Sequence, residues 1–169
     1  MLIPVVTIIG KSKSGKTTLV ENLIPALRQK GYRVGTVKHH SHSGFEIDQP
    51  DKDSWRHAQA GSQHVVIAAP DKIASYRSIE SELSLDEVLD EFQDVDIVLV
   101  EGYKQAGKPA IEIVRAERSL ELLNSVEQRI AVVSDTQLEA PVLQFDLEDI
   151  EGVAALIEAQ FLVNKNDLL

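Results

Sequence analysis

The chain has 169 residues, of which 43% are hydrophobic, and it contains no cysteine. This length and apolar content suit one α/β domain with a real core, while the lack of cysteine excludes disulfides and thiolate metal sites. A formal net charge of −10 argues against non-specific nucleic-acid binding, which requires a basic surface. The apolar N-terminus is too short for a membrane span and lacks the marks of a signal peptide, so we expect a soluble, cytoplasmic protein that binds no membrane.

The first elements along the chain alternate between strand and helix patterns. Residues 2–9 form a β-branched apolar run ending before a glycine, which predicts a buried strand. Residues 16–30 carry leucines at every fourth position, which predicts one face of a helix. A second strand is expected at 32–38, and a polar, histidine-rich loop follows over 39–52.

The rest of the chain predicts a hairpin and a further series of strands and helices. A short helix is expected from Asp53 or Ser54 through Ala60. Runs at 64–69 and 73–77 flank a Pro-Asp-Lys turn and predict an antiparallel hairpin. The remaining pattern predicts helices at 85–92, 119–124 and 147–162, and strands at 95–100, 110–114 and 129–133.

The segment GKSKSGKT at residues 10–17 matches the phosphate-binding pattern G-x-x-x-x-G-K-[ST] at every fixed position. A loop can match by chance, but the strand before it and the helix after it are the context that the motif requires. Its glycines let backbone N–H groups and the helix N-terminus face phosphate oxygens. Lys16 is predicted to reach the β- and γ-phosphates, and Thr17 to ligate Mg²⁺. The predicted nucleotide-binding residues of this segment are Gly10, Lys11, Ser12, Lys13, Ser14, Gly15, Lys16, Thr17 and Thr18.

These elements predict an α/β fold of the P-loop NTPase kind. Alternating strands and helices imply three αβα layers around a mostly parallel sheet, to which the hairpin would add an antiparallel edge. No repeat or linker divides the sequence, so residues 1–169 are assigned to a single nucleotide-binding domain.

A second protein ligand for Mg²⁺ is expected at the end of another core strand. Glu101 directly follows the apolar run at 95–100, and ligands bind at the carboxyl ends of parallel strands, so Glu101 and Thr17 should converge. The competing interpretation is an ordinary solvated glutamate, but Gly102 would let the backbone approach closely, which favours a functional role. Asp96 is a weaker candidate because it lies at the other end of the strand.

Several blocks of sequence occur in the order found in one known family. Besides the P-loop they are KHH at 38–40, GFEID at 44–48, KDS at 52–54, AG at 60–61 and LVEGYK at 99–104. With these blocks the chain resembles the MobB family, molybdopterin-guanine dinucleotide biosynthesis protein B, over nearly its whole length. The resemblance implies a P-loop protein that binds GTP and hydrolyses it weakly, works as a homodimer, and assists MobA, the guanylyltransferase that attaches GMP to molybdopterin. Where the family usually has Pro-Gly, this chain has Pro50-Asp51, so the local turn is expected to differ.

The histidine-rich loop stands where P-loop proteins can sense the γ-phosphate. Asp48 and Asp53 are both placed to contact Mg²⁺ through water or to orient an attacking water, and we assign Asp48 and Lys16 as catalytic. For Asp53, simple helix capping is an equal alternative. Arg56 and Lys52 can meet an anion, either a nucleotide phosphate or the phosphate of molybdopterin.

Two other functions use the same P-loop. The histidines suit Ni²⁺ or Zn²⁺, as in nickel-insertion GTPases, although the lack of cysteine and the small number of histidines weigh against metal delivery. An autonomous small-molecule kinase would need an arginine-bearing lid, and the arginines of this chain are scattered.

Guanine is often bound by an N-K-x-D segment at the end of a strand. The literal match at 164–167 follows a predicted helix at the chain end, so we interpret it as a coincidence. Asp135 directly follows the strand at 129–133 and is the better candidate for contacting the base, with a turn-forming aspartate as the competing interpretation. Sequence physics does not separate GTP from ATP, and the preference for GTP rests on the resemblance.

The hairpin at 64–77 exceeds what a minimal nucleotide domain needs. Exposed edge strands pair readily with other chains, so we hypothesise that it helps to build a homodimer, although an edge covered within one subunit would look the same. Lys11 follows the first glycine of the loop, and in dimeric relatives such a lysine can reach the other subunit's phosphates. A solvated lysine is the simpler interpretation.

Overall fold

The computed structural model describes residues 3–40, 42, 44–123 and 127–162. The chain forms two compact units: Met1–His39 with Ser84–Leu169 is the first, and His40–Leu83 is the second. The second unit is therefore an insertion into the sequence of the first, and the single-domain assignment over 1–169 stays a prediction. None of the helices in the described ranges combines the length and apolar character needed to cross a membrane.

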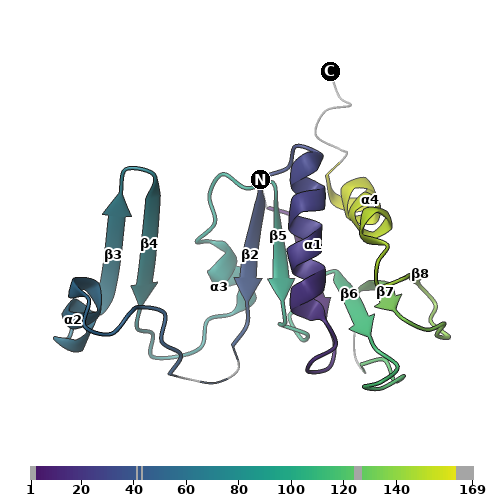
Figure 1. Ribbon diagram of the computed structural model, residues 1–169, viewed down its shortest axis with the longest axis horizontal. Helices are drawn as coiled ribbons and strands as arrows, with labels where there is room; N and C mark the ends of the chain where they lie inside the picture. The colour runs from purple at the N-terminus through teal and green to yellow at the C-terminus, as the bar shows by residue number, and fades with distance from the viewer. Residues whose placement is uncertain (1–2, 41, 43, 124–126, 163–169) are drawn as a thin grey trace. The chain divides into compact units, whose positions relative to one another are not determined.

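The first unit is built on a six-stranded sheet in the order β2-β5-β1-β6-β7-β8 (Figure 1). Every neighbouring pair in this sheet is parallel, so the carboxyl ends of all its strands lie at one edge. The strands are β1 (Val5–Ile9), β2 (Val34–Lys38), β5 (Ile97–Glu101), β6 (Ala110–Val114), β7 (Arg129–Ser134) and β8 (Leu143–Phe145).

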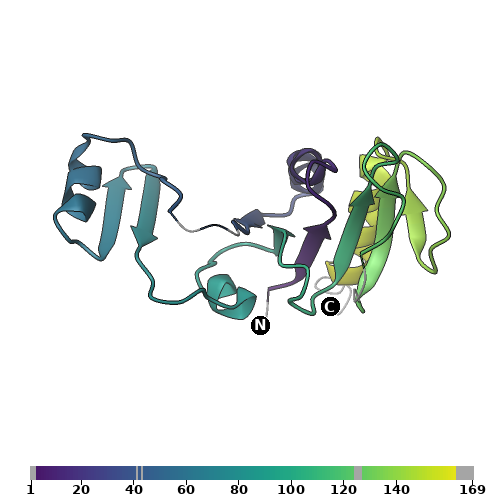
Figure 2. The same ribbon diagram turned by 90° about the horizontal axis from the view of Figure 1, so that it is seen from below.

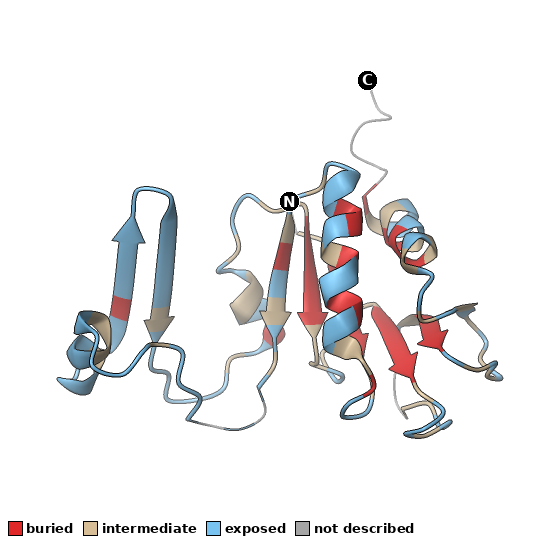
Figure 3. Ribbon diagram, in the orientation of Figure 1, coloured by how far each residue is buried: buried red, intermediate tan, exposed pale blue. Residues whose placement is uncertain are grey.

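Helices cover both faces of this sheet, as the alternation of side chains along its strands requires. In β5, Ile97 and Leu99 pack with α1 (Lys16–Gln29) and α4 (Ile150–Phe161), whereas Val98 and Val100 pack with α3 (Leu85–Leu89). Figure 2 shows α1 and α3 on opposite faces, and Figure 3 shows buried residues concentrated on the central strands and on α1. The predicted α/β class with a mostly parallel sheet between helices is confirmed.

The second unit contains α2 (Asp53–Gln59) and the antiparallel hairpin of β3 (His64–Ala69) and β4 (Lys72–Arg77). The hairpin forms where the sequence predicts it. Within the described residues it is a separate two-stranded sheet and not an edge of the parallel sheet. The hairpin pattern specifies how two strands pair with each other, but not which larger sheet they join.

Two local predictions are corrected, and one strand was not predicted. The segment predicted as a helix at 119–124 contains no helix over its described residues 119–123, and β8 was not predicted because its three residues are too short for a periodic pattern. Asp53 does not cap α2: Lys52 holds the cap position without a side-chain hydrogen bond, and Asp53 is the first helical residue.

Candidate functional site

The first glycine of the loop between β1 and α1 lets the loop backbone pack closely against β6. Gly10 has φ +150°, and a Cβ atom there would stand 2.5 Å from the carbonyl oxygen of Ile113 and 2.7 Å from the Ser14 hydroxyl. Only glycine fits this close approach between the loop and β6. The Ser14 side chain is buried, and its hydroxyl has no hydrogen-bond partner among the described residues. A phosphate oxygen or an ordered water would satisfy it, which suits an anion-binding loop.

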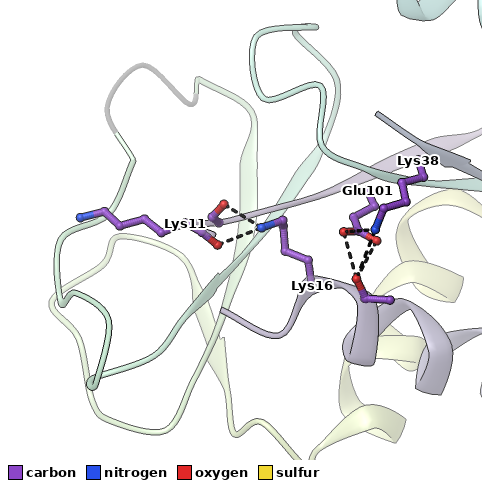
Figure 4. Close-up of polar contacts among 6 residues, drawn as sticks. Lys11, Lys16, Lys38 and Glu101 are labelled. Atoms are coloured by element: carbon purple, nitrogen blue, oxygen red, sulfur yellow. Dashed lines mark hydrogen bonds and ion pairs between the residues drawn. The ribbon is translucent and has the colours of Figure 1, made fainter. Parts of the chain in front are cut away.

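Lys16 closes the loop over its own backbone (Figure 4). Its Nζ donates to the carbonyl oxygen of Gly10 at 3.1 Å and to that of Lys11 at 2.8 Å. Burial lowers the pKa of Lys16, the positive charge of Lys38 adds to this, and the negative charge of Glu101 opposes it. The ammonium group is therefore held at the loop and lies close enough to Glu101 and Lys38 for their charges to act on it.

Thr17 and Glu101 come together as the sequence predicts. The Thr17 hydroxyl lies 3.0 Å from both carboxylate oxygens of Glu101, whose side chain is 15% exposed. A third member of this cluster, Lys38, was not predicted from the sequence. Its Nζ lies 2.9 Å from Glu101 Oε1 and 3.5 Å from Thr17 Oγ1 (Figure 4). Lys38 is the register partner of Glu101 where β2 pairs with β5, and its position at the end of a predicted strand was the available signal.

These oxygen atoms fit Mg²⁺. Neighbouring oxygens around an octahedral ion bound at about 2.1 Å lie roughly 3 Å apart. The hydroxyl oxygen of Thr17 and the carboxylate oxygens of Glu101 already have this spacing. Both are hard oxygen donors at the carboxyl edge of the sheet, which is the chemistry that Mg²⁺ prefers.

The backbone after Glu101 is as tight as the loop itself. Gly102 has φ +106°, and its N–H donates to the Ile8 carbonyl at 3.0 Å. A Cβ atom at this position would stand 2.8 Å from Cβ of His39. This packing fixes the path of the backbone directly after Glu101, the last residue of β5. Gly102 therefore helps to position the Glu101 carboxylate.

We expect Gly102→Ala to destabilise the protein and to weaken the Mg²⁺-dependent part of nucleotide binding, because relieving the contact with His39 must shift Glu101. Gly107→Ala is the matched control: Gly107 has φ +64°, but nothing lies within 4 Å of a Cβ there. Gly107→Ala should lower the free energy of unfolding by about 1–2 kcal/mol, the cost of placing alanine in a left-handed backbone conformation. Gly102→Ala should lower it by more than that. Urea unfolding and titration of nucleotide with and without Mg²⁺ measure both effects, and equal losses in the two variants would contradict the positioning role.

The other predicted binding residues lie on the loops around the P-loop. Asp135 follows β7 and accepts a hydrogen bond from the Ala116 N–H at 2.9 Å. Lys11 donates to the Ser119 hydroxyl and lies 3.6 Å from the Glu121 carboxylate, so its side chain points away from Lys16 (Figure 4). Ser12 and Lys13 are exposed.

A groove of about 600 Å³ begins beside the P-loop helix. Thr18 and Arg115 line it, and the guanidinium of Arg115 would lie 3.8 Å from a Cβ at Gly15. The remaining lining residues come from α1 and from the segment that enters α4: Asn22, Pro25, Ala26, Gln29, Leu147, Glu148, Ile150 and Glu151.

Asp48 belongs to the second unit, where it joins a hydrogen-bonded network. It accepts from the Tyr76 hydroxyl at 2.8 Å and from the Gln49 N–H at 2.8 Å. A hydrogen bond from the Ser54 side chain, followed by the Tyr76 bond, lowers the pKa of Asp48, so the carboxylate stays ionised at neutral pH. Burial and the bond to Asp48 raise the pKa of Tyr76 to about 12.

This network predicts an alkaline transition. The pKa of folded Tyr76 lies above its ordinary value of 10, so the contribution of the Tyr76 proton to stability is complete below pH 10 and is lost as the pH rises through about 12. The phenolate absorbance of the folded protein should therefore show a tyrosine that ionises near pH 12. Tyr76→Phe should remove that step, and a step that persists in this variant would assign it to another tyrosine.

Other candidate residues have simpler surroundings. Asp96 accepts hydrogen bonds from Arg33 at the opposite end of β5 from Glu101, and the segment 164–167 lies outside the described residues. Asp51, at the position where the resembling family has glycine, takes a left-handed φ of +67°. Among the residues described, no group of three or more His, Cys, Asp or Glu side chains could hold a metal ion.

Comparisons with known proteins identify the family to which the chain is similar. The family model for molybdopterin guanine dinucleotide synthesis protein B matches residues 5–135. The chain is 39% identical to the molybdopterin-guanine dinucleotide biosynthesis adapter protein of Haemophilus influenzae, over 92% of this chain and 88% of that protein. It is 35% identical to the protein of the same name from Escherichia coli, over 92% of each chain.

Solved structures show the same fold. A crystal structure of molybdopterin-guanine biosynthesis protein B has a TM-score of 0.75 and 33% identity, with 92% of this chain and 98% of that chain covered. The MobB homologue from Bacillus stearothermophilus has a TM-score of 0.72 and 28% identity, with 93% and 97% covered. The P-loop geometry, the family match and these relatives lead to one conclusion: the chain belongs to the MobB family.

Proposed function

We propose that this chain binds GTP together with Mg²⁺ and acts as an accessory protein in making the guanine dinucleotide form of the molybdenum cofactor. The observation that carries the proposal is the meeting of Lys16, Thr17 and Glu101 at one edge of the sheet in a member of the MobB family. The adapter proteins of Haemophilus influenzae and Escherichia coli support the pathway. The family match gives no support to a small-molecule kinase or a nickel-insertion GTPase.

The chain's own residues divide the work at the phosphates. Lys16 would hold the terminal phosphates, and Thr17 and Glu101 would hold Mg²⁺, which when bound neutralises charge on phosphate oxygens. The assignment of Asp48 as a catalytic residue rests on the sequence alone. Its oxygens already accept hydrogen bonds within the second unit and its pKa is lowered, so its carboxylate by itself is a weak base.

We place the nucleoside in the groove beside α1. The groove starts at Thr18, directly after the P-loop, and about 600 Å³ is ample for a nucleoside. Asp135 accepts a hydrogen bond from the N–H of Ala116, which directly follows the groove residue Arg115. Asp135 is our candidate for accepting hydrogen bonds from guanine.

Calorimetry with GTP and ATP tests this proposal, with and without a MobA-like guanylyltransferase. We expect GTP to bind more tightly than ATP in the presence of Mg²⁺, and slow release of phosphate to water. We also expect the guanylyltransferase, with or without molybdopterin, to bind the GTP-loaded protein. Absence of triphosphate binding would refute the proposal, and phosphoryl transfer to a small acceptor would favour the kinase.

We further propose that the protein is a cytoplasmic homodimer and that the hairpin contributes to its interface. Val66, Ile67 and Ile73 are 52%, 43% and 72% exposed on β3 and β4, and a two-stranded sheet by itself is only marginally stable. A second copy of the chain would cover these side chains. Light scattering should give a dimeric mass for the native protein and a lower one for Ile73→Lys. A monomeric native mass, with and without nucleotide, would contradict the dimer.

A further inference from the structure

Lys38 contacts the same oxygen atoms that we propose as ligands of Mg²⁺. Its Nζ is 2.9 Å from Glu101 Oε1 and 3.5 Å from Thr17 Oγ1, and the Thr17 hydroxyl contacts both oxygens of that carboxylate (Figure 4). The pairing of β2 with β5 places Lys38 directly beside Glu101, so the contact follows from the backbone register. A single cluster therefore contains two oxygen donors and a tethered cation.

An ammonium ion and Mg²⁺ would compete for this cluster. A metal ion bound to Thr17 and Glu101 would sit about 2.1 Å from oxygens that Lys38 already contacts, so the two cations would repel each other at short range. Glu101 is held at 15% exposure, but the Lys38 side chain is 61% exposed. An ion pair this exposed is weak, and its lysine can move away without disturbing the core.

A bound triphosphate would give Lys38 another anionic partner. Lys38 Nζ lies 3.5 Å from the hydroxyl of Thr17, the residue that follows Lys16 in the P-loop. Phosphate oxygens held by Lys16 therefore lie in the field of both lysines. If a metal ion displaced Lys38 before a triphosphate was bound, the ammonium groups of Lys16 and Lys38 would lie close together with less negative charge beside them. Their repulsion would oppose binding of the metal ion.

We propose that Lys38 acts as a tethered competitor of the divalent metal, which it keeps from Thr17 and Glu101 until nucleotide phosphates arrive to receive the lysine. Lys38 is thus a positioning residue that makes metal binding depend on nucleotide. The inference rests on the proposed nucleotide and metal site, and it assigns to this lysine the coupling between the two ligands.

Titration of the nucleotide-free protein with Mn²⁺, followed by electron paramagnetic resonance, tests the competition directly. Lys38→Met should bind Mn²⁺ at least about fivefold more tightly than the native protein, the lower end of common coupling strengths. Lys38→Arg keeps the charge and should behave as native. Lys108→Met is the matched control, because it also frees a carboxylate, Asp86, but Lys108 precedes β6 at the opposite edge of the sheet from the P-loop.

The same titration with a non-hydrolysable GTP analogue measures the coupling. The analogue should raise the Mn²⁺ affinity of the native protein more than that of Lys38→Met. Equal nucleotide-free Mn²⁺ affinity in native, Lys38→Met and Lys38→Gln proteins, all with native thermal unfolding, would overturn the competition. Failure of the native protein to bind the analogue with Mg²⁺ would instead refute the proposed function, whatever the nucleotide-free titrations show.

Discussion

Lys16→Ala is expected to abolish measurable binding of the triphosphate while leaving the fold intact. The ammonium group of Lys16 is held over the loop by the carbonyl oxygens of Gly10 and Lys11, where phosphate would bind. Hydrogen bonds to charged groups contribute about 1.5–3 kcal/mol each, so losing two to phosphate oxygens weakens binding by at least roughly 100-fold. Because Lys16 is only partly buried and donates to carbonyl oxygens of its own loop, the free energy of unfolding should change little.

Calorimetric titration of GTP with Mg²⁺ measures this loss, and thermal unfolding checks the fold. Arg28→Ala is the control, since Arg28 is an exposed cation near the other end of the same helix. The control should bind GTP like the native protein. Unchanged affinity in Lys16→Ala would remove the P-loop assignment altogether.

Arg129→Met is expected to cause the largest loss of stability. Arg129 donates to the Glu112 carboxylate through Nε at 2.8 Å and to the Leu123 carbonyl at 2.7 Å, and Glu112 is only 1% exposed. Removing the guanidinium leaves a buried carboxylate without its counter-charge, which typically costs about 3–5 kcal/mol.

Urea unfolding at neutral pH measures this effect. The double variant Glu112→Leu with Arg129→Met should be more stable than Arg129→Met alone, because it removes the unpaired charge as well. Arg118→Met is the control, since Arg118 pairs with Glu117 at the exposed surface, and it should lose less than about 1 kcal/mol. If Arg129→Met lost no more than this control, the ion pair would have no structural importance.

The P-loop and its surrounding elements were predictable because their signals are local. A fixed pattern of glycines, lysine and threonine between an apolar strand and an amphipathic helix specifies residues 10–17, and the apolar run before Glu101 specifies β5. The meeting of Thr17 and Glu101 followed from the rule that parallel strands end at one edge. Lys38 was missed as a member of the site because its contact depends on β2 lying next to β5, a strand order that no local pattern encodes.

The loop after β6 shows how a distant side chain overrides a local pattern. The leucines and glutamates around Leu123 favour a helix, but the Leu123 N–H donates to Glu112 at 2.7 Å and its carbonyl accepts from Arg129. The buried ion pair thus takes backbone groups that a helix would use itself. The separate hairpin sheet was unpredictable for a related reason, since strand pairing beyond the hairpin depends on the whole fold.

The strand order has a consequence for how the protein is made. β1 leads into the P-loop, but its neighbours in the sheet, β5 and β6, begin only at Ile97 and Ala110. β2 lies beside β5 at the edge of the sheet, so it also has no pairing partner until β5 has been made. A nascent chain that has emerged from the ribosome only through the inserted unit holds the phosphate loop with no strand beside it. Pairing between strands that are far apart in the sequence forms slowly, and the apolar strands stay exposed until it is complete. The proposed nucleotide site can therefore assemble only after β5 and β6 have been made, so a bound nucleotide would stabilise the finished sheet but could not guide the pairing of its first strands.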